Sequence, residues 1–392
     1  MTTQPPLTIG IDARAAAEVP AGRGRTVREL LRALAARGER AQPEPEPGNP
    51  GAGGEGTQPD AGRRCRYVLY AREPWAGAAL DERFSWRTIA ARDPLWHVQA
   101  ARAANRECDV FLSTNSYLTP WFLRIPAVPI VYDLVTFEPA MRPNRRSAVI
   151  ERLTLGLAVR RSARLLAISQ ATADALTERF PRAQGRVRVV RLGATPPATG
   201  ELTAEQAAEL PAPGFVLAVG TLEPRKNLPR LVAAFQSLAP ELQRAHPLVV
   251  VGALGWETGE TLTALRSLGE RARMLGFVPD AALAELYRRC GAFCYPSLGE
   301  GFGLPVLEAM SAGAPTITSN LSSLPEVGGE AAEYVDPYDV ASIAAGLERV
   351  LGDPELGGRL REAGPRRAAE FSWDRFAAET LELLQSAASS RS

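Results

Sequence analysis

The chain has 392 residues, of which 45% are apolar and 23% charged, values typical of a soluble globular protein with room for two or three domains. Lys and Arg number 45 against 44 Asp and Glu, which leaves a net charge of +1 and argues against a dedicated nucleic-acid-binding protein. No apolar run approaches the ~18 residues of a membrane span, and the N-terminus lacks the basic start and apolar core of a secretory signal. We therefore expect a cytoplasmic protein.

Short apolar runs alternate with helical patterns over the first half of the chain. The run Leu7–Asp12 predicts a strand, and apolar residues spaced by three and four predict a helix from Thr26. Residues 41–62 are rich in Pro and Gly and nearly free of apolar side chains, so we expect a disordered insert there. Further strands are predicted at Tyr67–Tyr70, Val110–Leu112, Val128–Leu134, Leu165–Ile168 and Val187–Val190.

The alternation restarts after a Pro-rich stretch, residues 196–213, which we interpret as a linker. Strands are then predicted at Phe215–Val219, Leu248–Val251, Met274–Phe277, Ala292–Tyr295 and Thr316–Thr318. Strands that alternate with helices indicate parallel, doubly wound sheets. We predict two α/β domains, residues 1–195 and 214–371, followed by a last helix within 372–392.

The densest motif is SLGEGFGLPVLE, residues 297–308. A glycine-rich loop here follows a strand and leads into a helix near Pro305, and such a helix start favours an anion. We expect Glu300 on the loop and Glu308 in the first helical turn to point into one cleft, where carboxylates accept hydrogen bonds from sugar hydroxyls. The alternative is an ordinary capped helix in which Glu308 complements the helix dipole.

A second motif, GTLEPRKNL at residues 220–228, directly follows a predicted strand. It contains Lys226, the only lysine of the chain, since the other 44 basic residues are arginines. Adjacent Arg225 and Lys226 side chains can neutralise a diphosphate without a metal. The alternative is a solvated turn before a helix.

Three other features carry weaker signals. The Gly-x-Gly loop within Pro20–Arg25 follows the first strand, and such loops are common. Asp133 ends another strand, where it could cap the backbone. Cys290 and Cys294 are interpreted as buried thiols and not as part of a metal site.

Together these motifs resemble the family 4 glycosyltransferases of the GT-B fold. The resemblance covers nearly the whole chain, from the opening IGIDAR through GTLEPRKN and EGFGLPVLEAMSAGAP to FSWD at residues 371–374. It implies two Rossmann-like domains facing across a cleft, the N-terminal one on the acceptor side and the C-terminal one on the donor side. It also implies retaining transfer of a hexose from a nucleotide sugar, with no metal or cofactor bound. The GTLEPRKN form is similar to bacterial mannosyltransferases, so GDP-mannose is the favoured donor beside a UDP-linked sugar.

The resemblance assigns roles to the conspicuous residues. Glu300 is expected to hold the donor hexose and Glu308 the donor ribose, while Lys226 falls on the diphosphate-binding lysine. Thr221 stands where the family usually has arginine, and Arg225 is expected to supply that charge. The remaining donor contacts implied are Gly22, Gly301, Phe302, Gly303, Leu304 and Val306.

One position departs from the family pattern. Many members have histidine where this chain has Tyr132, and a tyrosine cannot become a cation near neutral pH. Tyr132 and Asp133 stay candidate sugar contacts. The lost histidine also keeps an alternative open, a non-catalytic GT-B protein that binds nucleotide sugars; an epimerase or phosphorylase of this fold is less favoured.

The expected acceptor is a cell-surface polysaccharide or a lipid-linked glycan. The stretch 142–164 contains seven arginines against Glu151 alone. It could rest on anionic lipid at the inner face of the cell membrane, or form a solvated helix face. No nucleic-acid partner is expected.

Overall fold

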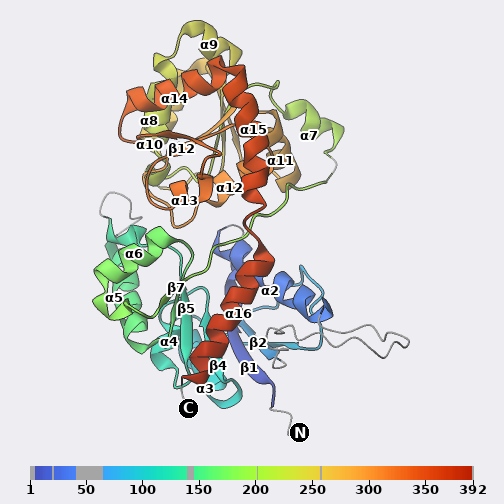
Figure 1. Cartoon of the computed structure of the whole chain (residues 1–392), viewed down its shortest axis with the longest axis vertical. Helices are drawn as coiled ribbons and strands as arrows, with labels where there is room; N and C mark the ends of the chain where they lie inside the picture. The colour runs from blue at the N-terminus through green and yellow to red at the C-terminus, as the bar shows by residue number, and fades with distance from the viewer. Residues whose placement is uncertain are drawn as a thin grey trace, which may run out of the picture.

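The computed structural model describes residues 5–19, 22–40, 65–138, 145–200, 202–256 and 258–390. These residues form two parallel sheets, one in each half of the chain, and the predicted α/β class with two doubly wound sheets is confirmed (Figure 1). The insert predicted at 41–62 lies outside the described residues. None of the described helices combines the length and the apolar content that crossing a membrane requires.

The first sheet has seven strands in the order β3-β2-β1-β4-β5-β6-β7. Its strands are β1 (Leu7–Asp12), β2 (Cys65–Ala71), β3 (Phe84–Thr88), β4 (Val110–Ser113), β5 (Ala127–Val131), β6 (Leu165–Ala167) and β7 (Val187–Val189). Its helices are α1 (Arg14–Glu18), α2 (Arg23–Arg40), α3 (Leu95–Glu107), α4 (Thr119–Phe122), α5 (Arg145–Arg161) and α6 (Gln170–Arg179), with the 3-10 turns η1 (Val135–Phe137) and η2 (Pro181–Ala183). The strand order reverses between β1 and β4, which makes that point the topological switch of the sheet.

The second sheet has six strands in the order β10-β9-β8-β11-β12-β13, and its order reverses between β8 and β11. Its strands are β8 (Val216–Val219), β9 (Leu248–Val251), β10 (Ala272–Gly276), β11 (Ala292–Tyr295), β12 (Thr316–Ser319) and β13 (Glu333–Val335). The helices of this half are α7 (Ala204–Glu209), α8 (Leu228–Ser237), α9 (Pro240–Ala245), α10 (Gly259–Ser267), α11 (Asp280–Arg289), α12 (Leu304–Ser311), α13 (Leu324–Gly328), α14 (Val340–Gly352), α15 (Pro354–Ala368) and α16 (Trp373–Ser389), with the 3-10 turns η3 (Pro224–Lys226) and η4 (Gly269–Arg271). The short helix α7 lies inside the stretch interpreted as a linker.

The helix predicted from Thr26 begins three residues earlier, at Arg23. The loop predicted up to Arg25 was therefore wrong at its end, because Arg23 and Arg25 already belong to the first turn of α2. The apolar face of α2 is fully buried against the first sheet through Val27, Leu30 and Leu31, and that burial fixes how the first turn faces the second domain.

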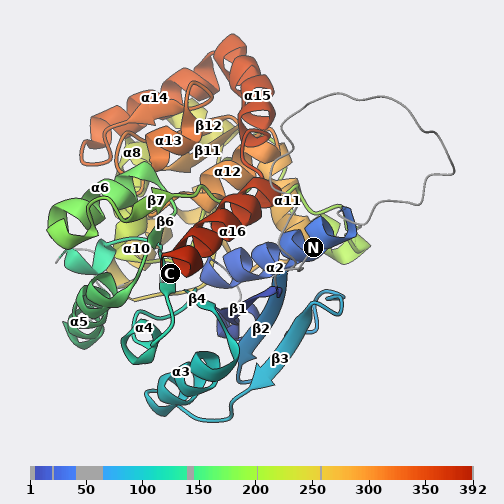
Figure 2. The ribbon, with the colours of Figure 1, turned by 60° about the horizontal axis from the view of Figure 1, so that its bottom comes forward.

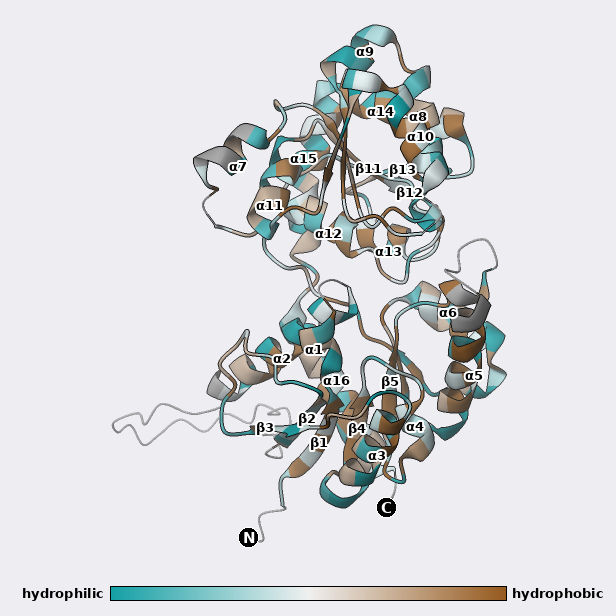
Figure 3. Ribbon diagram, turned by 180° about the vertical axis from the view of Figure 1, so that it is seen from behind, coloured by the Kyte–Doolittle hydropathy of each residue, from teal (hydrophilic) through white to brown (hydrophobic). Residues whose placement is uncertain are grey.

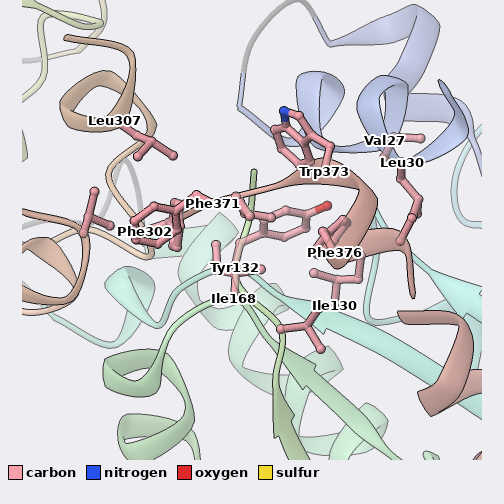
Figure 4. Packing of buried hydrophobic residues seen from close by; sticks show 14 of the residues in the cluster. Val27, Leu30, Ile130, Tyr132, Ile168, Phe302, Leu307, Phe371, Trp373 and Phe376 are labelled. Carbon is pink, nitrogen blue, oxygen red and sulfur yellow. The ribbon is translucent and has the colours of Figure 1, made fainter. Parts of the chain in front are cut away.

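The last helix returns to the first half of the chain. From the end of α15, α16 runs down beside α2 and packs on β4 and β5 (Figures 1 and 2). One buried apolar cluster is continuous between the two halves and includes Tyr132 of the first half with Phe302, Phe371 and Trp373 of the second (Figure 4). The two domains are therefore joined by packed side chains as well as by the chain itself.

Candidate functional site

Two predicted motifs meet at the switch point of the second sheet. Arg225 and Lys226 lie in η3, just after β8, while Glu300 follows the neighbouring strand β11. Because both strands are parallel, their carboxyl ends lie at the same edge, where open α/β sheets bind ligands. The pairing of β8 with β11 therefore brings the two sequence motifs close together.

The carboxylate of Glu300 is the centre of a polar network. Its Oε1 accepts hydrogen bonds from Lys226 Nζ at 2.8 Å, Tyr295 Oη at 2.8 Å and Ser297 Oγ at 2.7 Å. Its Oε2 accepts from Arg225, whose second amino group bonds to Glu223. Glu300 is thus saturated by protein donors, and two cations are held at one carboxylate.

The network is buried, and its charges shift one another. Burial alone would raise the pKa of Glu300, but Arg225 and Lys226 outweigh it and lower that pKa to about 2. Burial lowers the pKa of the Lys226 ammonium, and Glu300 opposes that shift. Arg225 and Lys226 face the ionised Glu300, and Glu223 is a second carboxylate beside Arg225. The positive and negative charges of this cluster therefore compensate one another in the absence of a ligand.

Backbone contacts fix the two motifs against each other. Asn227, at a φ of +60°, caps α8 and donates through Nδ2 to the Pro296 carbonyl at 3.0 Å. The Arg225 carbonyl accepts from the Leu298 amide at 2.9 Å, and Arg225 Nη1 donates to the Gly299 carbonyl at 3.0 Å. The cation pair therefore moves with the glycine-rich loop as one unit.

The glycine-rich loop leads into α12 as predicted, but the helix begins at Leu304. Gly303 has a φ of +111°, and a Cβ there would lie 2.7 Å from Leu324 Cδ2, so the sharp entry requires glycine. Phe302 and Val306 are buried, and the Val306 amide donates to the Gly303 carbonyl at 3.0 Å. These two residues support the loop from within the core.

Glu308 occupies a different pocket from Glu300. It is the fifth residue of α12, so its predicted place in the first turn was wrong. Its Oε1 pairs with Arg25 of the first domain, and Tyr287 Oη donates to Oε2 at 3.4 Å. These three residues, with Asp280 and Thr195, line an interdomain pocket of about 420 Å³, open mouth included. Glu300 is not among the residues that line this pocket, since its carboxylate faces Arg225 and Lys226.

Of the two glutamates, Glu308 is the one whose ionised form is less favoured. Burial raises its pKa, and the Arg25 charge opposes the shift. The Arg25 guanidinium also lies 3.6 Å from Asp280, so one arginine of the first domain faces two carboxylates of the second. The pair with Arg25 occupies Glu308 Oε1, an atom that could otherwise accept a hydrogen bond from a ligand.

Tyr132 and Asp133 lie where β5 meets the glycine-rich loop. The Tyr132 ring is buried between Ile168, Phe371 and Phe376 (Figure 4), and its hydroxyl finds no hydrogen-bond partner among the described residues. Asp133 accepts the Val135 amide at 3.0 Å, as a backbone cap does. In this conformation the Tyr132 hydroxyl is not offered to the cleft.

The remaining predicted residues lie at the edges of the site. Gly22, with a φ of +53°, precedes α2 and has open space where a Cβ would stand, while Thr221 is exposed after β8. Cys290 and Cys294 are buried thiols, as predicted. Over the described ranges, no group of three or more His, Cys, Asp or Glu side chains is arranged to hold a metal ion.

Sequence reasoning missed three polar partners. Tyr295 and Ser297 flank the strand end that was singled out, so their position was the available signal. Arg25 was within the predicted loop, yet its contact with Glu308 joins residues 283 positions apart. No local pattern indicates such a contact, since it depends on how the two domains are placed.

The described residues thus form two doubly wound domains, with a cation pair at the switch point of the second and a pocket between the two. Residues 203–367 match the family described as "Glycosyl transferases group 1". The match covers the part of the chain that holds the motifs GTLEPRKN and EGFGLPVLEAM.

The chain is also similar to curated proteins over part of its length. The chain is 43% identical over 171 residues to "O-antigen chain mannosyltransferase B" of Escherichia coli, which is 43% of this chain and 45% of that protein. The chain thus spans less than half the length of this curated relative.

Solved structures match over nearly the full chain. Sucrose-phosphate synthase (tll1590) from Thermosynechococcus elongatus gives a TM-score of 0.71 at 20% identity, covering 97% of this chain and 98% of the other. Anabaena Alr3699/HepE, solved with UDP and glucose, gives 0.70 at 16% identity, covering 97% and 100%. These likenesses establish the GT-B fold.

Proposed function

We propose that this protein is a retaining glycosyltransferase that moves a mannosyl group from GDP-mannose to a hydroxyl of a cell-surface glycan, without a metal or cofactor. The observation that carries the proposal is the joint placement of Arg225 and Lys226 on Glu300 at the switch point of the donor-side domain. The relative named a mannosyltransferase supports the choice of sugar, and the structure solved with UDP and glucose supports a nucleotide-sugar donor.

The chemistry that follows is stabilisation of the leaving group. When the bond between the sugar and the diphosphate breaks, negative charge grows on the diphosphate, and preformed cations stabilise it more than they stabilise the ground state. Lys226 and Arg225 provide that charge, and Glu300 with Tyr295 and Ser297 holds both in place. Glu308 is assigned to the ribose hydroxyls, which requires Arg25 to release it.

The place of action also belongs to the proposal. We assign the protein to the inner face of the cell membrane, where a lipid-linked acceptor would be found. Support comes from exposed apolar side chains on α5 and α4, Val149, Ile150, Leu153 and Trp121, and from exposed Arg160 and Arg161. Hydrophobic and hydrophilic segments both appear along the ribbon of α5 (Figure 3). Such a combination suits an anionic lipid surface.

The test is the melting temperature of the purified protein with a panel of nucleotides and nucleotide sugars. A ligand at one hundred times its Kd stabilises the folded state by about 2.7 kcal/mol. We expect a shift with GDP, a larger one with GDP-mannose, and no change of either in a chelator. No shift with any member contradicts the proposal. A shift without transfer or slow donor hydrolysis favours the non-catalytic alternative.

A further inference from the structure

The first sheet has a switch point of its own, between β1 and β4, and polar residues gather beside it. Arg23 opens α2, the long helix that follows β1, and Tyr117 follows β4. Glu151 comes from α5, which lies across β5 from α2 (Figure 1). Open α/β sheets bind ligands at the carboxyl ends of the strands, where the strand order reverses. This edge of the first sheet is therefore a candidate binding site, as is the edge formed by β8 and β11.

Arg23 and Glu151 form an open pair there. Arg23 Nη2 lies 3.6 Å from Glu151 Oε1, and the side chains are 36% and 22% exposed. That separation is longer than an ordinary hydrogen bond, so both groups keep hydrogen-bonding capacity. The Arg23 guanidinium is held over the Tyr132 ring, 5.1 Å from its centroid, which positions it toward this edge.

Tyr117 adds a buried hydroxyl without a satisfactory partner. Its side chain is 6% exposed, and the hydroxyl makes no hydrogen bond of ordinary geometry within the described residues, although the Tyr132 backbone lies near it. An unsatisfied buried hydroxyl is costly, and a ligand that bonds to it would remove the cost. Burial also raises the pKa of Glu151, against the opposing Arg23 charge, so hydroxyl donors would stabilise its carboxylate.

The balance of charges selects the chemistry of the ligand. Among the described residues of the first domain at this edge, the cation Arg23 faces the two carboxylates Asp133 and Glu151, and these charges act on one another. At the second sheet, two cations converge on Glu300. Since these described charges hold no surplus of cations, they suit sugar hydroxyls, which donate to carboxylates and accept from a guanidinium, better than a phosphate.

The edge also lies next to the donor-side loop. A Cβ on Gly301 would fall 1.8 Å from the Tyr132 carbonyl oxygen and 3.0 Å from Asp133 Cβ, so β5 ends directly against the glycine-rich loop. A group bound by Arg23 and Glu151 would therefore lie beside the ligand of the second sheet.

We propose that Arg23 and Glu151, with Tyr117 behind them, bind the acceptor, and that its reacting end is a neutral sugar and not a phosphorylated headgroup. This inference rests on the proposed function. It assigns a recognition site to the first domain.

The test measures binding, so it does not depend on turnover. With GDP present, methyl α-D-mannopyranoside and mannose 6-phosphate are titrated by ligand-detected NMR against wild type, Glu151→Gln and Arg23→Ala. Glu333→Gln is the matched control, since Glu333 is also 22% exposed and paired with an arginine, Arg349, on the second domain. We expect wild type to prefer the neutral mannoside, and each site variant to weaken its binding about tenfold or more, the loss of one charge-assisted hydrogen bond.

The GDP affinity of each variant reports on folding and on the donor site. Unchanged GDP binding with weakened mannoside binding supports the inference. Mannoside binding equal to wild type in both variants overturns it, as does a wild-type preference for mannose 6-phosphate or a wild type that binds GDP but no mannoside. A wild type that binds no nucleotide contradicts the proposed function itself, and the inference falls with it.

Discussion

Lys226 is distinguished by its residue type and by its burial. It is the only lysine in a protein that otherwise uses arginine, and its ammonium is nearly buried, bonded to Glu300 and lying 4.8 Å from the centre of the Tyr295 ring. The ammonium is a compact charge that bonds to Glu300 and Tyr295, whereas an arginine would place a larger planar group there. Lys226 therefore places a compact positive charge between Glu300 and Tyr295.

We expect Lys226→Ala to lower kcat by about 100-fold, the usual cost of removing one preorganised charge or donor from a transition state. Nucleotide release from GDP-mannose measures the effect. Arg244→Ala, an exposed position of the same domain, is the control and should behave as wild type. A normal rate in Lys226→Ala contradicts the role of the cation pair.

The carboxylate of Glu300 also predicts how stability depends on pH. Its pKa is about 2 in the folded protein against about 4.3 in an unfolded chain. The folded state therefore gains stability above pH 4.3, and that gain disappears as the pH falls toward 2. In urea unfolding, Glu300→Gln should cost about 3 kcal/mol at pH 7 and roughly half of that at pH 3.

A control separates this effect from general acid sensitivity. Glu382→Gln removes an exposed carboxylate paired with Arg188 and should change stability little at either pH. A cost for Glu300→Gln that is equal at pH 7 and pH 3 would mean that the network does not stabilise the ionised form.

At the scale of elements, each predicted strand is present in the structure, and β3 and β13 were missed. The strands Leu7–Asp12, Leu248–Val251 and Ala292–Tyr295 match their predicted limits, because buried parallel strands are rich in apolar residues. β3 was missed because this edge strand, FSWRT, is mostly solvent-facing, and β13 because it is a short edge strand, EYV, in which Val335 alone is buried. The strand predicted to Leu134 ends at Val131, where the chain turns against the second domain.

The site residues that follow buried strands could be predicted from the sequence, as could those strands themselves. Glu300 and Lys226 were placed together because each follows a buried parallel strand, and parallel strands end at one edge. The pairing of Arg25 with Glu308 depends on packing between domains, which no local spacing encodes. The burial of the Tyr132 ring has the same origin, since Phe371 and Phe376 come from the far end of the chain.

Helix α5 gives the membrane proposal a defined face. Val149, Ile150 and Leu153 are 53%, 62% and 64% exposed, and Trp121 of neighbouring α4 is 40% exposed. Arg161 follows Ile150 by eleven positions, which returns to the same side of a helix, and its guanidinium lies 5.4 Å from the Trp121 ring centre. Arg142 and the side chains of Arg145 and Arg146 lie outside the described parts of the chain, and Arg152 donates to the Phe137 carbonyl at 2.8 Å. The exposed arginines described on this helix are therefore Arg160 and Arg161.

We expect Ile150→Glu with Leu153→Glu to reduce co-sedimentation with phosphatidylglycerol vesicles at least about tenfold, because two side chains that would be buried in lipid contribute about 1.5–3 kcal/mol each. Met274→Glu, which changes an apolar residue 44% exposed on β10, should leave binding intact. Wild-type binding to uncharged phosphatidylcholine vesicles equal to that for phosphatidylglycerol would contradict the role of the arginines.

At the scale of the whole molecule, three contacts between the domains stand out beside the shared apolar cluster. Arg25 pairs with Glu308, and Glu326 of α13 accepts the Gln170 and Ala171 amides at 2.8 and 2.7 Å, so a carboxylate of one domain caps a helix of the other. The third contact is the close approach of Gly301 to the Tyr132 carbonyl. Of these, only the glycine contact excludes any side chain, which makes it the sharpest probe of the closed arrangement.

Gly301→Ala should therefore open the molecule while leaving each domain folded. A methyl group 1.8 Å from the Tyr132 carbonyl oxygen meets backbone of the first domain, so the glycine-rich loop and the segment after β5 must move apart. We expect a larger radius of gyration in small-angle scattering and GDP affinity near that of wild type, because Lys226 and Arg225 lie wholly in the second domain. Turnover should fall about 100-fold, since catalysis tolerates little displacement of reacting groups. Gly358→Ala, with open space at its Cβ, should change none of these. If Gly301→Ala keeps both the wild-type dimensions and the wild-type rate, the closed contact is not the conformation in which the protein works.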